Sequence, residues 1–165
     1  MRAPSMSWML HVTVAAIARR GDSFLLVEEE VNGRPLYNQP AGHLEENESL
    51  AEAAVRETLE ETAHHFKPQY IVGLYQWQQP GARDTYIRVA FAGDAQPAAQ
   101  PRELDRGILG AHWLELRQIR ALPAQRFRSI MVVRCIEDCL AGRRLPLSAA
   151  AYLDERGDAR RCPEK

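Results

Sequence analysis

The chain has 165 residues, 45% of them hydrophobic, which suits one domain with one core and makes a second domain unlikely on length alone. Its 21 basic and 22 acidic residues leave a formal net charge of −1, so no global field draws the protein to nucleic acid or to an anionic membrane. No apolar run approaches the ~20 residues that a membrane span needs. We therefore expect neither a nucleic-acid nor a membrane partner.

The N-terminal region predicts two paired strands. An apolar stretch after Arg2 has the composition of a short signal peptide, but alternating residues over 11–19 and a β-rich run over 23–31, joined by a turn at Gly21, favour a hairpin. Residues 1–8 are expected to be a loose extension. The pair Asn32-Gly33 predicts a further turn, followed by a short strand around Leu36.

A loop over 40–47 precedes a predicted helix. Ser49 followed by Glu52 forms a capping-box pattern, and small apolar residues continue the helix to about His64. Strands are expected at 70–79 and 85–92, then a loop over 94–107, a short strand at 111–114, a helical turn at 116–121 and a helix over 125–140 that Gly142 stops.

This order of elements predicts an α/β/α sandwich with a mixed β-sheet between helices. We expect the domain to span residues 9–147 and a weakly ordered tail to span 148–165. Cys135, Cys139 and Cys162 are an odd number without C-x-x-C spacing, which argues against a disulfide framework or a zinc site and favours the cytoplasm. Cys135 and Cys139 are expected to be small buried residues of the last helix.

The predicted helix after Ser49 concentrates negative charge. On a helix, Glu60 lies about 60° to one side of Glu57 and Glu61 about 40° to the other, so the three carboxylates share one face. Glu57 and Glu61 repel each other, and the C-terminal half of a helix disfavours anions. A hard cation, Mg²⁺ or Mn²⁺, would offset both effects. The alternative is a solvated acidic helix face.

The spacing over residues 42–61 resembles the catalytic box of the Nudix hydrolase family. Five residues separate Gly42 from Glu48, and seven more precede the run Arg56-Glu57-Thr58-Leu59-Glu60-Glu61. The resemblance implies the Nudix fold and hydrolysis of phosphoanhydride bonds. It also implies that Glu57, Glu60 and Glu61 ligate the metal, with Glu57 or a neighbouring carboxylate taking a proton from the attacking water.

The same resemblance gives Arg56 a supporting part. A charge-assisted bond from Arg56 would hold Glu57, with Glu48 as the other partner of the guanidinium. The alternative is an ordinary surface ion pair of Arg56 with Glu52 or Glu60. The chain departs from the family after the box, where Ala63 replaces a glycine and His64 an aliphatic residue. Because that glycine allows a left-handed helix end, we expect this helix to run about a turn longer, through His64 and His65.

A narrower resemblance involves residues 27–33, 38–45, 76–77 and 127–129. These segments are similar to those of the NudJ-type phosphatases, a subgroup of the family. The resemblance implies hydrolysis of nucleoside tri- and diphosphates, and of thiamine-related pyrophosphates such as hydroxymethylpyrimidine pyrophosphate, with orthophosphate as a product. A monomer and a homodimer both remain open.

Candidate substrate contacts follow from side-chain chemistry. Aromatic rings stack on bases and guanidinium groups bind phosphates, although core packing and surface ion pairs explain the same residues equally well. The candidates are Gln39, Trp77, Tyr86, Arg88 and Arg128. His43 is expected to make a structural hydrogen bond, and Glu103 or Asp105 is a candidate for a further metal ligand or base.

Two other functions remain open. One is an ADP-ribose or dinucleotide pyrophosphatase of the same fold, which would release two monophosphates. The other is a non-catalytic nucleotide-binding regulator. Regulators of this kind usually lose carboxylates of the box or carry a DNA-binding domain, and this chain shows neither feature.

Overall fold

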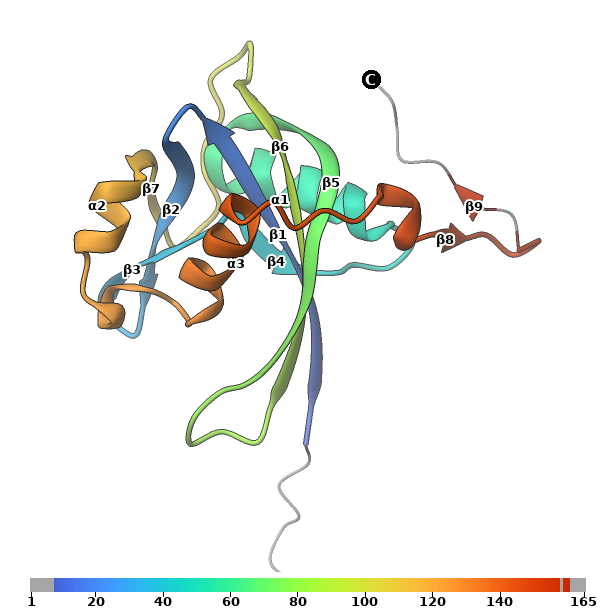
Figure 1. Ribbon diagram of the computed structural model, residues 1–165, viewed down its shortest axis with the longest axis horizontal. Helices are drawn as coiled ribbons and strands as arrows, with labels where there is room; N and C mark the ends of the chain where they lie inside the picture. Colours follow the sequence, from blue (N-terminus) through green and yellow to red (C-terminus); the bar gives the residue numbers. More distant parts are fainter. Residues whose placement is uncertain (1–7, 158, 161–165) are drawn as a thin grey trace, which may run out of the picture.

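The computed structural model describes residues 8–157 and 159–160, and its centre is a seven-stranded mixed sheet (Figure 1). The strand order is β3-β2-β1-β6-β5, with β4 paired to β1 and β7 paired to β2. Strands β1 and β6 are parallel and the other pairs are antiparallel. The strands are β1 (Leu10–Arg20), β2 (Ser23–Val31), β3 (Arg34–Asn38), β4 (Ala41–His43), β5 (His64–Gln78), β6 (Thr85–Pro97) and β7 (Ile108–Glu115).

Helices cover both faces of the sheet, which confirms the predicted α/β/α sandwich (Figure 1). Helix α1 packs on one face and α3 on the other. The helices are α1 (Leu50–Thr62), α2 (Leu116–Ala121) and α3 (Met131–Leu140), with 3₁₀ turns η1 (Ala124–Arg126) and η2 (Leu147–Ala149). A small antiparallel pair, β8 (Tyr152–Leu153) and β9 (Ala159–Arg160), follows. Within the described chain, no helix is long and apolar enough to cross a membrane.

The sheet has a core on each face because neighbouring strand residues point in opposite directions. Leu26 joins the cluster formed with Val132 and Ile136 of α3, whereas the adjacent Leu25 joins the cluster formed with Ala53 and other residues of α1. This is why the buried central parts of β1 (14–18) and β2 (24–27) are continuous apolar runs. The predicted burial of Cys135 and Cys139 is confirmed, and both are free thiols in the α3-side core, whereas Cys162 lies outside the described residues.

The predicted N-terminal hairpin is confirmed only at its turn. Register pairs join β1 and β2 at Arg19 with Phe24 and at Arg20 with Ser23. Beyond this turn the strands separate: β1 pairs with β4 and β6, and β2 with β3 and β7. Non-local partners therefore determine most of the pairing, and these are invisible to a local sequence pattern.

Several element boundaries differ from those predicted. Strand β5 begins at His64 and β6 continues to Pro97, because the two strands pair along their whole length. Strand β4 was not predicted. The helix expected from residue 125 begins at Met131, since η1 and an extended Phe127 come first.

The end of α1 corrects the expectation of a longer helix. The helix stops at Thr62, and Ala63 takes the left-handed conformation (φ 53°, ψ 35°) that the family's glycine would supply. Its N–H donates to the Leu59 carbonyl at 3.0 Å, and its own carbonyl accepts from the N–H of Ala98 at 2.8 Å. The β5–β6 pairing at His64 therefore ends the helix despite the missing glycine.

Ala63→Gly is expected to stabilise the protein by about 0.5–1 kcal/mol, because glycine adopts a positive φ without the steric cost that alanine bears. Urea unfolding of the variant and the wild type measures the difference. Ala53→Gly, on the buried side of α1, is the matched control and should destabilise. A stability loss in Ala63→Gly would contradict the conformation described here.

Candidate active site

Helix α1 presents its acidic residues through a well-defined N-terminus. Ser49 Oγ accepts from the Glu52 N–H at 3.2 Å, and the Ser49 N–H donates to Glu52 Oε2 at 2.7 Å, which confirms the capping box. The side chain of Glu52 is therefore engaged in the capping box at the start of the helix. Glu57 and Glu61 lie on the buried side of the helix, only 8% and 9% exposed, so they are not part of a solvated acidic face.

Arg56 is the centre of the ionic contacts around this helix. Its Nε and Nη2 donate to the two carboxylate oxygens of Glu48 at 3.0 and 2.7 Å, a bidentate pair. Its Nη1 donates to Glu57 at 2.8 Å and to Glu60 at 3.0 Å, and Nη2 also reaches the His43 carbonyl at 3.1 Å. The hydrogen bonds from Arg56 lower the pKa of Glu48. Arg56 therefore contacts both Glu48 and Glu57, and also Glu60.

Glu61 is held from the other side by the backbone of β4. The Ala41 N–H donates to Glu61 Oε2 at 2.9 Å. Burial is the main reason that the pKa of Glu61 rises to about 8, with the charges of Glu57, Glu29 and Asp105 adding to it. Burial also raises the pKa of Glu57, against the effect of Arg56. The protein thus holds two carboxyl groups where their ionised forms are disfavoured.

Gly42 makes room for the Glu57 carboxylate. A methyl group at position 42 would lie 2.0 to 2.4 Å from the carboxylate atoms of Glu57, closer than any real contact. Strand β4 is fixed in place by its pairing with β1, where Gly42 lies opposite Val14. The backbone of β4 therefore forms a wall against which two acidic side chains of α1 rest.

A divalent cation fits this donor set. Oxygen ligands suit Mg²⁺ and Mn²⁺, and a cation beside Glu57 and Glu61 would remove the penalty that burial imposes on their ionised forms. In the described part of the chain, no three potential ligand side chains are already gathered at metal-binding distance. The guanidinium of Arg56 forms ion pairs with Glu57 and Glu60, and its positive charge compensates part of their negative charge.

Asp105 lies beside these carboxylates and Glu103 has no described contact with them. The Asp105 N–H donates to the Glu60 carbonyl at 3.1 Å, and the charge of Asp105 raises the pKa of Glu57 and Glu61. Both Glu103 and Asp105 are exposed. Of these two candidates for a further ligand, Asp105 has the better position.

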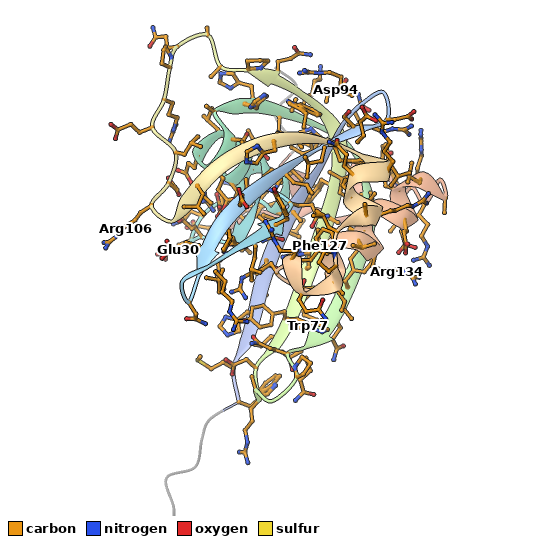
Figure 2. All side chains as sticks on the ribbon, turned by 90° about the vertical axis from the view of Figure 1, so that its left-hand side faces the viewer. Glu30, Trp77, Asp94, Arg106, Phe127 and Arg134 are labelled. Carbon is orange, nitrogen blue, oxygen red and sulfur yellow. The ribbon has the colours of Figure 1, made fainter. Side chains whose placement is uncertain are left out.

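A cavity of about 220 Å³ opens beside β4. Of the predicted substrate contacts, Trp77, Tyr86, Arg88 and Arg128 line it. Figure 2 shows Trp77 toward the protruding β5–β6 hairpin, below Phe127. The remaining lining residues are Thr13, Glu29, Asn38, Ala41, Gly42, His43, Gln79, Ser129 and Met131.

Gln39 is buried and is not among the residues that line the cavity. It is 1% exposed, its Nε2 donates to the Val132 carbonyl at 2.6 Å, and its Oε1 accepts from Arg88 Nη1 at 3.3 Å. Gln39 therefore holds Arg88 and ties the loop before β4 to α3. His43 does line the cavity, and its ring bonds to His11 at 3.2 Å.

Sequence reasoning missed several lining residues. Glu29 and Asn38 lie in segments that carry the narrower resemblance, which was the available signal. Nothing in the sequence pointed to Thr13 or Met131. Thr13 belongs to β1 and Met131 to α3, which are distant in the chain, and only the fold brings them together at the cavity.

Comparisons with known proteins give a family match and a curated relative. A family model described as the NUDIX domain matches residues 9–134. The chain is 39% identical to Phosphatase NudJ of Escherichia coli (strain K12) over 137 residues, which cover 83% of this chain and 88% of that protein.

Solved structures show the same architecture. A NUDIX hydrolase from Nitrosomonas europaea aligns with a TM-score of 0.84 and 43% identity, covering 88% of this chain and 98% of its own. The NUDIX domain of Shewanella oneidensis NrtR, complexed with ADP ribose, aligns with a TM-score of 0.63 over 86% of this chain and 93% of its own. At 17% identity, the second likeness concerns the fold alone.

Proposed function

Because the chain belongs to the Nudix hydrolase family, we propose that it uses Mg²⁺ or Mn²⁺ to hydrolyse nucleoside tri- and diphosphates and releases orthophosphate. The observation that carries this proposal is the pair of buried carboxyl groups, Glu57 and Glu61, next to the cavity at Gly42. Similarity to a phosphatase supports orthophosphate as the product. The resemblance to the NudJ-type phosphatases is the reason for including hydroxymethylpyrimidine pyrophosphate in the proposal.

Glu57, Glu60 and Glu61 would hold the metal. When bound, a divalent cation neutralises phosphate charge and makes a coordinated water a better nucleophile. The residues of the chain supply position: Arg56 restrains Glu57 and Glu60, and the Ala41 N–H restrains Glu61. Glu57 or a neighbouring carboxylate accepts the proton of the attacking water, for which a raised carboxyl pKa is favourable.

We also propose that the hydrolase domain extends to residue 147. The family model ends at residue 134, but a pair of backbone bonds joins Ile71 of β5 to Leu145 at 2.9 and 2.8 Å. This isolated bridge ties residue 145 to β5, the last strand in the order of the sheet. The location in the cytoplasm stays a prediction, and both a monomer and a homodimer remain open.

Product analysis tests the proposed reaction. The protein is incubated with nucleoside tri- and diphosphates, hydroxymethylpyrimidine pyrophosphate, ADP-ribose and a dinucleoside polyphosphate, each with Mg²⁺ and with Mn²⁺. Orthophosphate, pyrophosphate and monophosphates are then measured separately. We expect orthophosphate from the nucleoside tri- and diphosphates. Paired monophosphates from ADP-ribose or the dinucleotide, in place of orthophosphate, would support the pyrophosphatase alternative, and binding without turnover would support a regulator.

A further inference from the structure

Two histidine rings from different strands meet beside the cavity. His11 Nδ1 lies 3.2 Å from His43 Nε2, and the ring centroids are 5.3 Å apart with an angle of 63° between the planes. Each of these nitrogens carries either a hydrogen or a lone pair, depending on the tautomer. When both carry lone pairs, the two nitrogens form a pair of ligands for one cation.

The pairing of the strands holds the two rings together. Thr13 of β1 lies opposite His43 of β4, and His11 is two residues before Thr13, so both imidazoles are on one face of the sheet. Tyr86, opposite His11 on β6, stacks on its ring with centroids 4.6 Å apart and an angle of 15° between the planes. The rings are therefore fixed by the sheet before any ion binds.

An acidic side chain lies beside the other nitrogen of His11. Asp84 Oδ2 is 3.5 Å from His11 Nε2, which is buried and has no hydrogen-bond partner among the residues described. A histidine that ligates a metal usually donates its second N–H to a carboxylate, which fixes the tautomer and makes the ligand more basic. A hydrogen on Nε2, toward Asp84, leaves the lone pair on Nδ1, toward His43.

His43 leaves room for further ligands. The residue is exposed and lines the cavity. Partial burial and the nearby charge of His11 lower the pKa of His43, which favours the neutral imidazole that a metal needs. Within the described ranges, no third side chain completes a cluster of potential ligands. Water would therefore fill the remaining coordination positions of an ion held by the two rings.

The type of ligand separates this pair from the carboxylates of the box. Position 42 faces Glu57 on one side of β4, and the next residue, His43, lies on the opposite side because successive strand residues alternate. Carboxylate and water suit Mg²⁺ and Mn²⁺, whereas imidazole suits Zn²⁺ and Ni²⁺. Two nitrogens at about 2.0–2.1 Å from one ion are roughly 2.9 Å apart in octahedral and roughly 3.3 Å apart in tetrahedral geometry. The observed 3.2 Å lies between these values.

We propose that His11 and His43 bind a transition-metal ion that prefers imidazole, Zn²⁺ or Ni²⁺, at a separate metal site beside the cavity, with Asp84 orienting His11. The ion takes nitrogen ligands from the two rings and oxygen ligands from water. This site does not depend on the proposed function, because it uses none of the three carboxylates assigned to Mg²⁺ or Mn²⁺.

Calorimetric titration of the tag-free protein with Ni²⁺, in saturating Mg²⁺, measures the site without turnover. Ni²⁺ is the probe because thiolates compete more strongly for Zn²⁺. His43→Ala is expected to weaken Ni²⁺ binding at least ~10-fold, and Asp84→Asn about 10-fold. His65→Ala, which removes an exposed histidine of β5, is the matched control and should bind as the wild type does. Glu61→Gln should also retain the binding of Ni²⁺.

A second substitution separates a metal ligand from a hydrogen-bonding partner. His43→Gln can still hydrogen-bond to His11 but has no imidazole, so it should bind Ni²⁺ as weakly as His43→Ala. Because His43 is exposed, both variants should fold, and thermal unfolding checks this. Equal Ni²⁺ binding by the wild type and His43→Ala, or no binding by the wild type at millimolar Ni²⁺, would overturn the inference and leave the two rings with a hydrogen bond alone.

Anomalous diffraction from a crystal soaked in Ni²⁺ locates the ion. We expect a peak at about 2.0–2.2 Å from both His11 Nδ1 and His43 Nε2. A peak only at the carboxylates of the box, or only at His112 beside Glu28, would refute the assignment. Failure of the histidine site leaves the proposed function intact, whereas absence of turnover in a protein that binds Ni²⁺ between the rings counts against the proposed function alone.

Discussion

Glu61→Gln is expected to lower kcat by at least ~1000-fold while the protein remains folded. Glutamine has nearly the same shape and keeps an oxygen to accept from the Ala41 N–H, but it lacks the charge that would hold the metal. Orthophosphate release from a nucleoside triphosphate with saturating Mg²⁺ measures the loss. Full activity in the variant would refute the assignment of Glu61 as a ligand.

The same substitution should change the pH dependence of stability. In the metal-free protein the pKa of Glu61 is about 8, against an ordinary value of 4.5, so the folded state binds a proton that the unfolded state releases between these values. The wild type is therefore expected to lose stability as the pH rises from about 4.5 to about 8. Glu61→Gln removes this loss and should be more stable than the wild type at pH ~9 by roughly 2–4 kcal/mol, with little difference near pH ~4.

Urea unfolding in EDTA at several pH values measures this effect. Glu46→Gln, an exposed carboxylate in the loop before α1, is the matched control and should show no such trend. Addition of Mg²⁺ at high pH should stabilise the wild type and have much less effect on Glu61→Gln. If the two proteins were equally stable across the pH range, burial would not oppose ionisation of Glu61.

Gly42→Ala is expected to reduce kcat by ~100-fold with a change in the free energy of unfolding below ~1 kcal/mol. The added methyl group would overlap the Glu57 carboxylate. That carboxylate is the end of a flexible side chain, so it can move aside without disturbing the core, but the movement takes it away from its place beside Arg56. Activity should therefore fall far more than stability.

Gly110→Ala provides the control for this substitution. A methyl group there would meet only the end of the His112 ring, at 3.0 Å, and no carboxylate of the box. We expect Gly110→Ala to keep its activity. A Gly42→Ala protein with unchanged kcat would show that the position of Glu57 is less critical than the packing suggests.

The box illustrates what a local pattern can predict. Helical periodicity placed Glu57, Glu60 and Glu61 on one side of a helix, and the capping residues Ser49 and Glu52 located its start; the structure has both features. These properties depend on residues within a few positions of one another, which is why they follow from the sequence. Burial of Glu57 and Glu61 depends on the sheet, so the sequence alone could not distinguish a buried acidic face from a solvated one.

The end of the same helix shows the opposite case. Local propensity at Ala63 favoured a longer helix, but the pairing of His64 with Pro97, 33 positions later in the chain, ends it. A positive φ at an alanine costs about 1 kcal/mol, which the many hydrogen bonds of the β5–β6 pair readily offset. Long-range pairing of this kind cannot be read from the residues around the helix end.

By itself the sequence determined the α/β/α class, the acidic helix face and the membership of a hydrolase family. Only the tertiary structure showed that Gln39 accepts a hydrogen bond from Arg88 and that Gly42 leaves space for the Glu57 carboxylate. It also showed that Glu29 lines the cavity. The physical reason is distance along the chain. Helix periodicity and capping act over a few residues, whereas the cavity wall is assembled from strands and a helix whose pairing and packing the local pattern does not contain.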